Sequence, residues 1–214
     1  MRFGVLQFPG SCDEVDALHA ARRVGDAELI WHGDRDLGGA DAIIVPGGFS
    51  YGDYLRVDAI ARFSPVMESV IAFSREGGLV LGICNGFQVL CEAGLLPGAL
   101  LPNVDLRFIC RQVDLEVQTT ATPFTSTCEV GQRLSIPAKH TTGCFFGELP
   151  DEQVVLRYAE GHNFNGSQDD IAGVTNAEGN VMGLMPHPEH AVDALVGGSA
   201  DGLKLFAGMA AVHA

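Results

Sequence analysis

Cys84 is the residue whose surroundings best match those of a catalytic nucleophile. The apolar run at residues 79–83 leads into Gly82-Ile83-Cys84-Asn85-Gly86, and a helical pattern of apolar residues follows. We predict a strand, a sharp turn and a helix, with the thiol at the apex. Glycine on both sides permits so tight a turn, as in the nucleophile elbows of hydrolases, where the next backbone N–H can bind an oxyanion. A helix N-terminus beneath the sulfur also favours the thiolate. The alternative is an inert buried cysteine in an ordinary turn.

A histidine and a glutamate that could serve this thiol stand together in Pro186-His187-Pro188-Glu189-His190. The two prolines favour an extended backbone, in which residues two apart point the same way. Glu189 would then orient His187 and favour its protonated form, while His190 would point to the opposite side. Taken alone, the segment is also typical of a surface loop with solvated side chains. Together with Cys84, it supplies a base and a group that orients the base, which a catalytic thiol needs.

Gly48, in the sequence Pro46-Gly47-Gly48-Phe49, is a candidate oxyanion-binding residue. It follows the apolar run at 42–45, so we expect it at the carboxyl end of a buried strand, where open α/β sheets place their sites. Its backbone N–H and that of Asn85 could form an oxyanion hole. The alternative is a simple turn. A phosphate loop is excluded, because neither glycine-rich nucleotide motif is present.

The other polar candidates carry weaker signals. Gln88 lies one helical turn after Cys84 on the same side, so it either binds a polar substrate or caps a neighbouring loop. His140 and His162 fall in predicted loops without metal-ligand spacing, and we expect them to be structural. No other cysteine lies between two glycines, so we expect the remaining five to be small core residues.

The elements that must position these residues alternate along the first hundred residues. Strands are predicted at 2–8, 28–32, 42–45 and 79–83, and helices at 13–24, from about 57 to 78 with a new start at Ser64-Pro65, and at 85–94. Ser11 or Asp13 is the expected cap of the first helix. This alternation predicts an α/β fold with a parallel central sheet flanked by helices.

The second half of the chain follows a different pattern. Val113, Leu115 and Val117 alternate with polar residues, which is the period of a strand with one buried face. Further strands are predicted at 134–136, 154–158, 171–175 and 181–185, with a hairpin turn at 176–179 and a final helix within 199–212. We therefore expect added antiparallel strands. Since the sequence contains no internal repeat or linker, it predicts one domain, residues 1–214.

Composition excludes several classes of partner. The 214 residues carry a formal net charge of −14, so nucleic acid or an anionic membrane would be repelled. No apolar run reaches the roughly 18 residues of a membrane span, and the first residues read as a strand rather than a signal peptide. The six scattered cysteines form no C-x-x-C pair. They fit free thiols in a reducing cytoplasm, where we expect the protein to lie.

Three motifs together resemble the class I (triad) glutamine amidotransferases. They are Gly82-Ile83-Cys84-Asn85-Gly86-Phe87-Gln88, Pro46-Gly47-Gly48-Phe49-Ser50-Tyr51-Gly52-Asp53 and Pro186-His187-Pro188-Glu189. More narrowly, the chain resembles the glutaminase subunits of phosphoribosylformylglycinamidine synthases, through further stretches at 7–11, 94–100, 165–167 and 171–176. The resemblance covers almost the whole chain and implies a flavodoxin-like fold.

This resemblance implies that L-glutamine is hydrolysed to glutamate and ammonia. Cys84, His187 and Glu189 would form the catalytic triad, and Gly48 and Asn85 the oxyanion hole. No metal or cofactor is implied for this chain. The ammonia would pass to a separate large synthetase subunit, joined in some complexes by a third small subunit. That synthetase would use ATP and magnesium to convert formylglycinamide ribonucleotide to formylglycinamidine ribonucleotide in purine biosynthesis.

Three places depart from the family's usual pattern. Ser11-Cys12-Asp13 is one residue shorter than Ser-Asn-Cys-Asp, His140-Thr141-Thr142-Gly143 stands in place of His-Gly-Glu-Gly, and His190 in place of arginine. We expect none of them to contact the triad. Two other interpretations stay open at this stage, namely another cysteine–histidine enzyme on a related fold and a catalytically idle subunit that keeps the fold.

Overall fold

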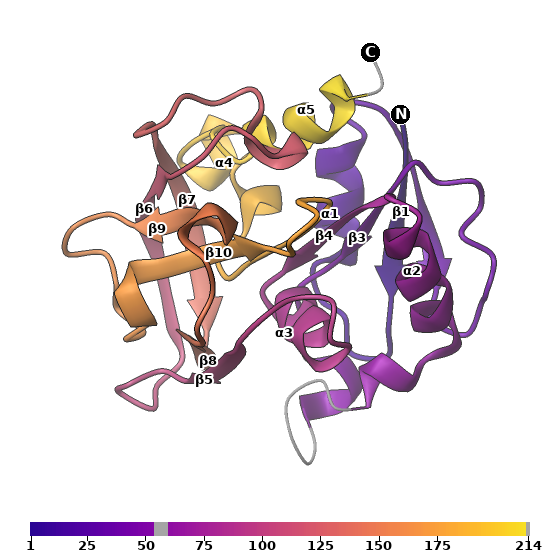
Figure 1. Cartoon of the computed structure of the whole chain (residues 1–214), viewed down its shortest axis with the longest axis horizontal. Helices are drawn as coiled ribbons and strands as arrows, with labels where there is room; N and C mark the ends of the chain where they lie inside the picture. The colour runs from indigo at the N-terminus through magenta and orange to yellow at the C-terminus, as the bar shows by residue number, and fades with distance from the viewer. Residues whose placement is uncertain (54–59, 213–214) are drawn as a thin grey trace.

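The computed structural model describes residues 1–53 and 60–212 (Figure 1). Its main feature is a nine-stranded sheet to which both halves of the chain contribute. In spatial order the strands are β2 (Asp26–Trp31), β1 (Arg2–Gln7), β3 (Ala42–Val45), β4 (Leu79–Ile83), β11 (Val181–Leu184), β10 (Ile171–Thr175), β9 (Val154–Tyr158), β6 (Ile109–Val117) and β7 (Arg133–His140). The helix start predicted near residue 57 lies outside the described residues.

The first five of these strands form a parallel half, on the right in Figure 1. Every residue of β3 and β4 is buried, so both faces of the sheet are covered at its centre. The helix α1 (Glu14–Ala21) packs on β1 and β2 and meets α5 (Leu203–Ala211), while α2 (Pro65–Arg75) and α3 (Asn85–Glu92) pack on β4. Because parallel strands end at the same edge, the segments after β3, β4 and β11 converge there.

The strands β10, β9, β6 and β7 form an antiparallel half, on the left in Figure 1. In β6 the predicted alternation is confirmed, since Val113, Leu115 and Val117 are buried and the residues between them are partly exposed. The edge strand β7 contains Pro137, whose missing N–H is tolerated at the edge of a sheet. The predicted addition of antiparallel strands to a parallel sheet is thus confirmed.

A second sheet and a short helix were not expected from the sequence. A second sheet pairs β5 (Ala99–Pro102) with β8 (Thr142–Phe146), and neither segment shows a clean alternation of apolar and polar residues. The short helix α4 (Ala194–Gly197) follows β11. The first helix is shorter than predicted, and Asp13 holds its N-cap position without a capping hydrogen bond from its side chain. That carboxylate binds Lys139 instead.

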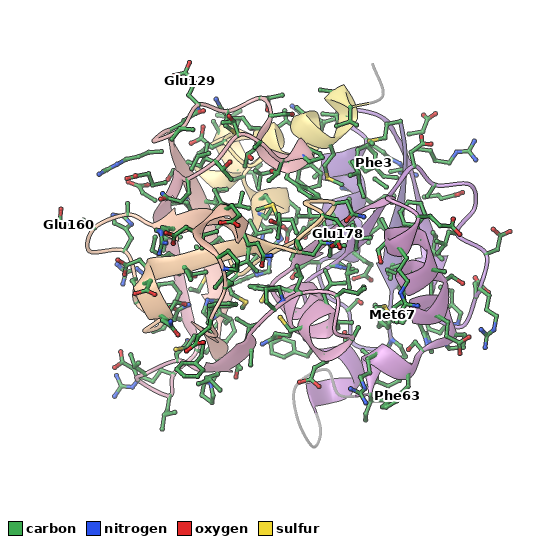
Figure 2. The ribbon with its side chains drawn as sticks, in the orientation of Figure 1. Phe3, Phe63, Met67, Glu129, Glu160 and Glu178 are labelled. Carbon is green, nitrogen blue, oxygen red and sulfur yellow. The ribbon has the colours of Figure 1, made fainter. Side chains whose placement is uncertain are left out.

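Among the described residues, the buried apolar side chains form one hydrophobic cluster that runs through both halves of the sheet. Phe3 and Met67 are fully buried in it, whereas Glu129 and Glu160 lie at the periphery (Figure 2). Within the described ranges, no helix is both long and apolar enough to cross a membrane. The one-domain organisation of residues 1–214 stays a prediction.

Candidate active site

Cys84 stands on a strained turn between β4 and α3. Its backbone has φ 50° and ψ −104°, which is rare for a residue with a side chain. A Cβ on Gly86 would collide with the carbonyl oxygen of Val45, and one on Gly82 would lie 2.8 Å from the carbonyl oxygen of Gly86. The start of α3 therefore approaches the end of β3 closely enough to require glycine. The predicted strand, turn and helix around the thiol are confirmed.

Gly48 lies beside Cys84, in the segment that follows β3. Its φ of 146° and the 2.7 Å that would separate an added Cβ from the backbone nitrogen of Cys12 both demand glycine. Ser11 and Gly48 face each other as an isolated antiparallel pair. The hydrogen bonds of this pair are made by the residues on either side, from Cys12 N to the carbonyl oxygen of Gly47 and from Phe49 N to that of Gly10. In such a pair the N–H of Gly48 points away from the Ser11 strand. Gly48 and Cys84 line the same cavity of about 180 Å³.

Asn85 and Gln88 connect the thiol turn to Ser50, after β3, and to Thr142, at the start of β8. Asn85 Oδ1 accepts hydrogen bonds from Ser50 N at 3.1 Å and Ser50 Oγ at 2.5 Å. Its amide nitrogen donates to Gln88 Oε1 at 3.3 Å, and Gln88 Nε2 donates to the carbonyl oxygen of Thr142 at 2.8 Å. Gln88 lines the cavity, as its helical spacing predicts. A direct contact between Gln88 and a substrate stays a prediction.

His187 and Glu189 form a buried pair at the end of β11. Glu189 Oε1 lies 2.6 Å from His187 Nδ1, and both side chains are almost fully buried. Because a carboxylate only accepts, Nδ1 must carry the hydrogen of this bond. The predicted contact is thus present, but the predicted backbone was wrong. Pro188–His190 forms a 3-10 turn rather than an extended strand, and this turn brings Glu189 back onto the ring.

The charge state of His187 follows from this environment. Burial disfavours the imidazolium, but the charges of Glu189 and Cys84 and hydrogen bonds to both side chains outweigh burial and raise the pKa of His187 to about 10. Since Glu189 holds Nδ1, Nε2 is the nitrogen left for Cys84. Apart from that thiol, Nε2 has no hydrogen-bond partner among the described residues. The arrangement supplies a proton beside the sulfur, as nucleophilic catalysis by a thiol requires.

His190 does not point away from His187, which corrects the prediction. The two rings are stacked, with centroids 5.1 Å apart and planes 7° from parallel. The 3-10 turn explains this, because a helical turn places side chains differently from an extended chain. His190 Nε2 lies 3.2 Å from Asp16 Oδ2 and 3.5 Å from Asp13 Oδ1.

His140 was expected in a loop, but it is the last residue of β7 and lines the same cavity as Cys84. Its Nδ1 lies 3.0 Å from Asn103 Oδ1. Asn103 uses its amide nitrogen to donate to the carbonyl oxygens of Arg107 and His140, so Oδ1 is the acceptor and Nδ1 of His140 carries the hydrogen. Burial, reinforced by the charge of His187, lowers the pKa of His140 to about 3. The ring is therefore neutral, with an unprotonated Nε2.

The expectation that the divergent stretches avoid the triad was also wrong. Asp13 Oδ2 lies 3.6 Å from His187 Nδ1, and Asp13 Oδ1 accepts a hydrogen bond from Lys139 Nζ at 2.7 Å. Cys12, Thr141 and Thr142 line the cavity as well. The roles of Asp13 and Lys139 were not inferred from the sequence. The one signal that could have identified them is that they fall in or next to the stretches that depart from the family pattern.

One group of side chains at the site has the spacing of metal ligands. Asp13, His187, Glu189 and His190 each place a donor atom within 4.8 Å of the others. However, the Lys139 ammonium already lies against Asp13, and the protonated ring of His187 lies against Glu189. The two carboxylates are therefore neutralised by cations of the protein itself, and their proximity requires no metal.

The fold and the cysteine–histidine–glutamate arrangement together define a class of protein. A family model of the CobB/CobQ-like glutamine amidotransferase domain matches residues 1–201. The chain therefore belongs to the glutamine amidotransferase family.

Within that family, the chain is similar to PurQ subunits of phosphoribosylformylglycinamidine synthase. It is 59% identical over 213 residues to PurQ of Mycolicibacterium paratuberculosis, covering 96% of this chain and 94% of the relative. It is 56% identical over 214 residues to PurQ of Rubrobacter xylanophilus, covering 96% of each. The structure of PurLQS from Thermotoga maritima includes a chain with a TM-score of 0.94 and 43% identity, over 100% of this chain and 99% of that one. These similarities confirm the predicted family and fold class.

Proposed function

We propose that this chain hydrolyses L-glutamine to glutamate and ammonia, and that it delivers the ammonia to a separate synthetase subunit. The observation that carries the proposal is the buried pair of His187 and Glu189 beside the strained turn of Cys84. A thiol, a protonated imidazole and a carboxylate that orients the imidazole are the parts required for acyl transfer from a carboxamide.

In the first half of the proposed reaction, the Cys84 thiolate attacks the side-chain carboxamide carbon of glutamine. A carbon–sulfur bond forms, and the carbonyl electrons move onto oxygen, where the N–H groups of Gly48 and Asn85 bind the oxyanion. The intermediate collapses, the carbon–nitrogen bond breaks, and the leaving nitrogen takes the proton from His187 Nε2. The products of this half are ammonia and a γ-glutamyl thioester on Cys84.

In the second half, His187 is neutral and accepts a proton from water at Nε2. The resulting hydroxide attacks the thioester carbon, and collapse of the second intermediate expels the thiolate and releases glutamate. Glu189 keeps Nδ1 protonated and the ring oriented throughout, so that Nε2 exchanges the proton. Neither half requires a metal or a redox cofactor.

The partner in this proposal is the large subunit of phosphoribosylformylglycinamidine synthase, with a third small subunit where the complex contains one. The support comes from the names of the relatives, which are subunits of that synthase. The large subunit would use ATP and magnesium to convert formylglycinamide ribonucleotide to the amidine in purine biosynthesis. The free state of all six cysteines is in keeping with a cytoplasmic location.

The decisive experiment measures ammonia release from glutamine by the wild type and by Cys84→Ala, each with and without the synthetase subunit. We expect little activity from the chain alone and strong activity in the complex, which Cys84→Ala lowers by about 10⁴-fold or more. Cys110→Ala is the matched control, because Cys110 is an exposed cysteine on β6. Undiminished glutaminase activity in Cys84→Ala would refute the proposal.

Covalent labelling gives a second, independent test. A glutamine analogue with an electrophilic carbon in place of the carboxamide should modify Cys84, and peptide mass spectrometry identifies the labelled residue. Cys12 lines the same cavity and is exposed, so it is an internal competitor. Labelling of Cys12 in preference to Cys84 would contradict the assignment.

A further inference from the structure

We propose that Asp13 and Lys139 form a charge pair that positions His187 and adjusts how tightly its imidazole holds the catalytic proton. This inference rests on the proposed role of His187 in glutamine hydrolysis. Both residues act through His187, so they are positioning residues.

Among the described residues, three basic side chains lie within 4 Å of the Asp13 carboxylate, and His190 Nε2 is one of them, at 3.5 Å from Oδ1. Asp13 Oδ1 lies 2.7 Å from Lys139 Nζ, and Asp13 Oδ2 lies 3.6 Å from His187 Nδ1. The Asp13 side chain is 6% exposed, so water and salt screen these interactions weakly. Nδ1 of His187 therefore faces two carboxylates, Glu189 at hydrogen-bond distance and Asp13 about an ångström further away.

Local packing fixes Asp13 in this place. The backbone N–H groups of Cys12 and Asp13 both donate to the carbonyl oxygen of Gly47, at 3.2 and 3.3 Å. A Cβ on Gly47 would lie 2.5 Å from Asp13 Oδ2 and 2.8 Å from His187 Cε1. The carboxylate and the imidazole are thus packed against the same glycine, next to the candidate oxyanion donor Gly48.

Lys139 connects this loop to the thiol side of the site. Its ammonium binds Asp13, while its carbonyl oxygen lies 3.9 Å from Cys84 Sγ. Two residues earlier on β7, the carbonyl oxygen of Pro137 accepts the backbone N–H of His187 at 2.7 Å. The pair therefore ties the loop beside Gly48 to the strand that passes Cys84 and His187. By neutralising Asp13, Lys139 leaves Glu189 as the main partner of Nδ1.

The other titratable groups around the ring do not duplicate this pair. They are Cys84 after β4, Glu189 and His190 on the turn of His187 itself, His140 at the end of β7, and Asp16 on α1 behind His190. Among the described carboxylates, Asp13 and Glu189 are the two within 4 Å of His187 Nδ1. Asp13 is the one of these whose charge Lys139 balances.

The pair predicts opposite effects for its two members. Asp13→Asn removes a negative charge and leaves the Lys139 ammonium uncompensated, so the pKa of His187 should fall by about one to two units. Lys139→Gln leaves Asp13 uncompensated, so the pKa of His187 should rise by about one unit. In Asp13→Asn with Lys139→Gln, the pKa should return toward the wild-type value. Damage to a purely structural contact would instead move both single variants in the same direction.

The test follows the ring signal of His187 by NMR against pH in the full chain labelled with ¹³C-histidine. The same substitutions are repeated in a Glu189→Gln background, where the titration lies at lower pH and Asp13 is the remaining carboxylate beside Nδ1. Asp16→Asn is the matched control, since its carboxylate contacts His190 rather than His187. Near-UV circular dichroism checks that each variant is folded.

Opposite shifts for Asp13→Asn and Lys139→Gln, with no shift for Asp16→Asn, would support the pair. Shifts in the same direction, or none in folded variants of either background, would overturn it. In the complex, the alkaline limb of kcat/KM for glutamine should move with the NMR values. Because the NMR titration needs no turnover, shifts seen without any glutaminase activity would refute the proposed function while leaving the charge pair intact.

Discussion

Two buried histidines line one cavity, and their proton affinities are shifted in opposite directions. The pKa of His187 is raised to about 10 and that of His140 is lowered to about 3. Both rings are buried, and burial alone lowers the pKa of a histidine. The main difference is the group that contacts Nδ1, and for His187 the charge of Cys84 and a hydrogen bond to Cys84 raise the pKa further. His187 Nδ1 meets the carboxylate of Glu189, whereas His140 Nδ1 meets the neutral amide of Asn103.

This contrast separates the histidine of the proposed triad from a supporting one. His187 keeps a proton beside Cys84 at neutral pH, and in the proposed reaction it transfers that proton during acyl transfer. His140 stays neutral, is tilted against the ring of Phe164, and helps to hold the end of β7 through Asn103. A second cation next to the imidazolium would lower the pKa of His187. A neutral His140 therefore helps His187 to keep its proton.

The largest expected effect comes from making the two environments alike. Glu189→Gln replaces the carboxylate by an amide, so that Nδ1 contacts a neutral group, as in His140. Burial then lowers the pKa of His187 without the opposing charge of Glu189. We expect kcat/KM for glutamine in the complex to fall by about 10²- to 10⁴-fold, because the ring loses both its orientation and its proton. The measurement is the pH profile of kcat/KM, whose alkaline limb should move to lower pH.

The matched control for Glu189→Gln is Glu160→Gln, at an exposed glutamate on the periphery of the antiparallel half. Stability supplies a second readout. Folding raises the pKa of His187, so its ion pair stabilises the folded chain fully below about pH 6.5 and ceases to do so as pH rises through about 10. An alkaline limb that stays in place in Glu189→Gln would show that this carboxylate is not what separates the two histidines.

A moderate effect on the pH dependence of folding stability is expected for His140→Asn at acid pH. Between pH 6.5 and about 3, the unfolded chain binds a proton at His140 that the folded chain does not. The protonation of His140 therefore leaves the free energy of unfolding unchanged above pH 6.5. Below that pH it lowers the free energy of unfolding by about 1.4 kcal/mol per pH unit at most. His140→Asn removes that dependence and can keep a donor near the position of Nδ1. Urea unfolding between pH 4 and 6.5 measures the free energy of unfolding at each pH. This free energy should depend less on pH in the variant than in the wild type.

His19→Asn, on the exposed face of α1, controls for the loss of one imidazole and should keep the wild-type slope. At pH 7 some loss of stability is expected in His140→Asn, because packing against Phe164 is reduced. That loss is the same at every pH. Only the slope of the free energy of unfolding against pH therefore reports on the protonation of His140. Equal slopes for the wild type and His140→Asn would mean that His140 takes up its proton in the folded chain as well.

The sequence predicted best what depends on neighbouring residues. The elbow of Cys84, the Gly48 turn and the His187–Glu189 contact arise from short stretches at the ends of buried strands, where spacing and glycine decide the geometry. The contact of His187 with Glu189 was correct although its backbone was not, because a 3-10 turn and an extended strand both allow it. For His190 the two conformations differ, and the prediction failed there.

The unpredicted part of the site depends on distant contacts. Asp13 and Lys139 are 126 residues apart in sequence, and no local pattern marks an aspartate that binds a lysine on a remote edge strand. His140 was placed in a loop, since residues 138–140 follow Pro137 and show no clean period of two. Its position at the site follows from the pairing of β7 with β6, a register that the sequence does not specify.

The smallest expected effect tests whether stacking matters as much as charge. His190 stacks on His187, and its Nε2 lies near Asp13 and Asp16. His190→Arg places a permanent cation there, but both carboxylates counter its charge, so the pKa of His187 should fall by less than about one unit. NMR titration measures this shift, and His190→Gln, which adds no charge, should leave the titration in place. Since the guanidinium can also stack on the ring, a fall as large as that in Glu189→Gln would mean that His190, and not Glu189 alone, distinguishes His187 from His140.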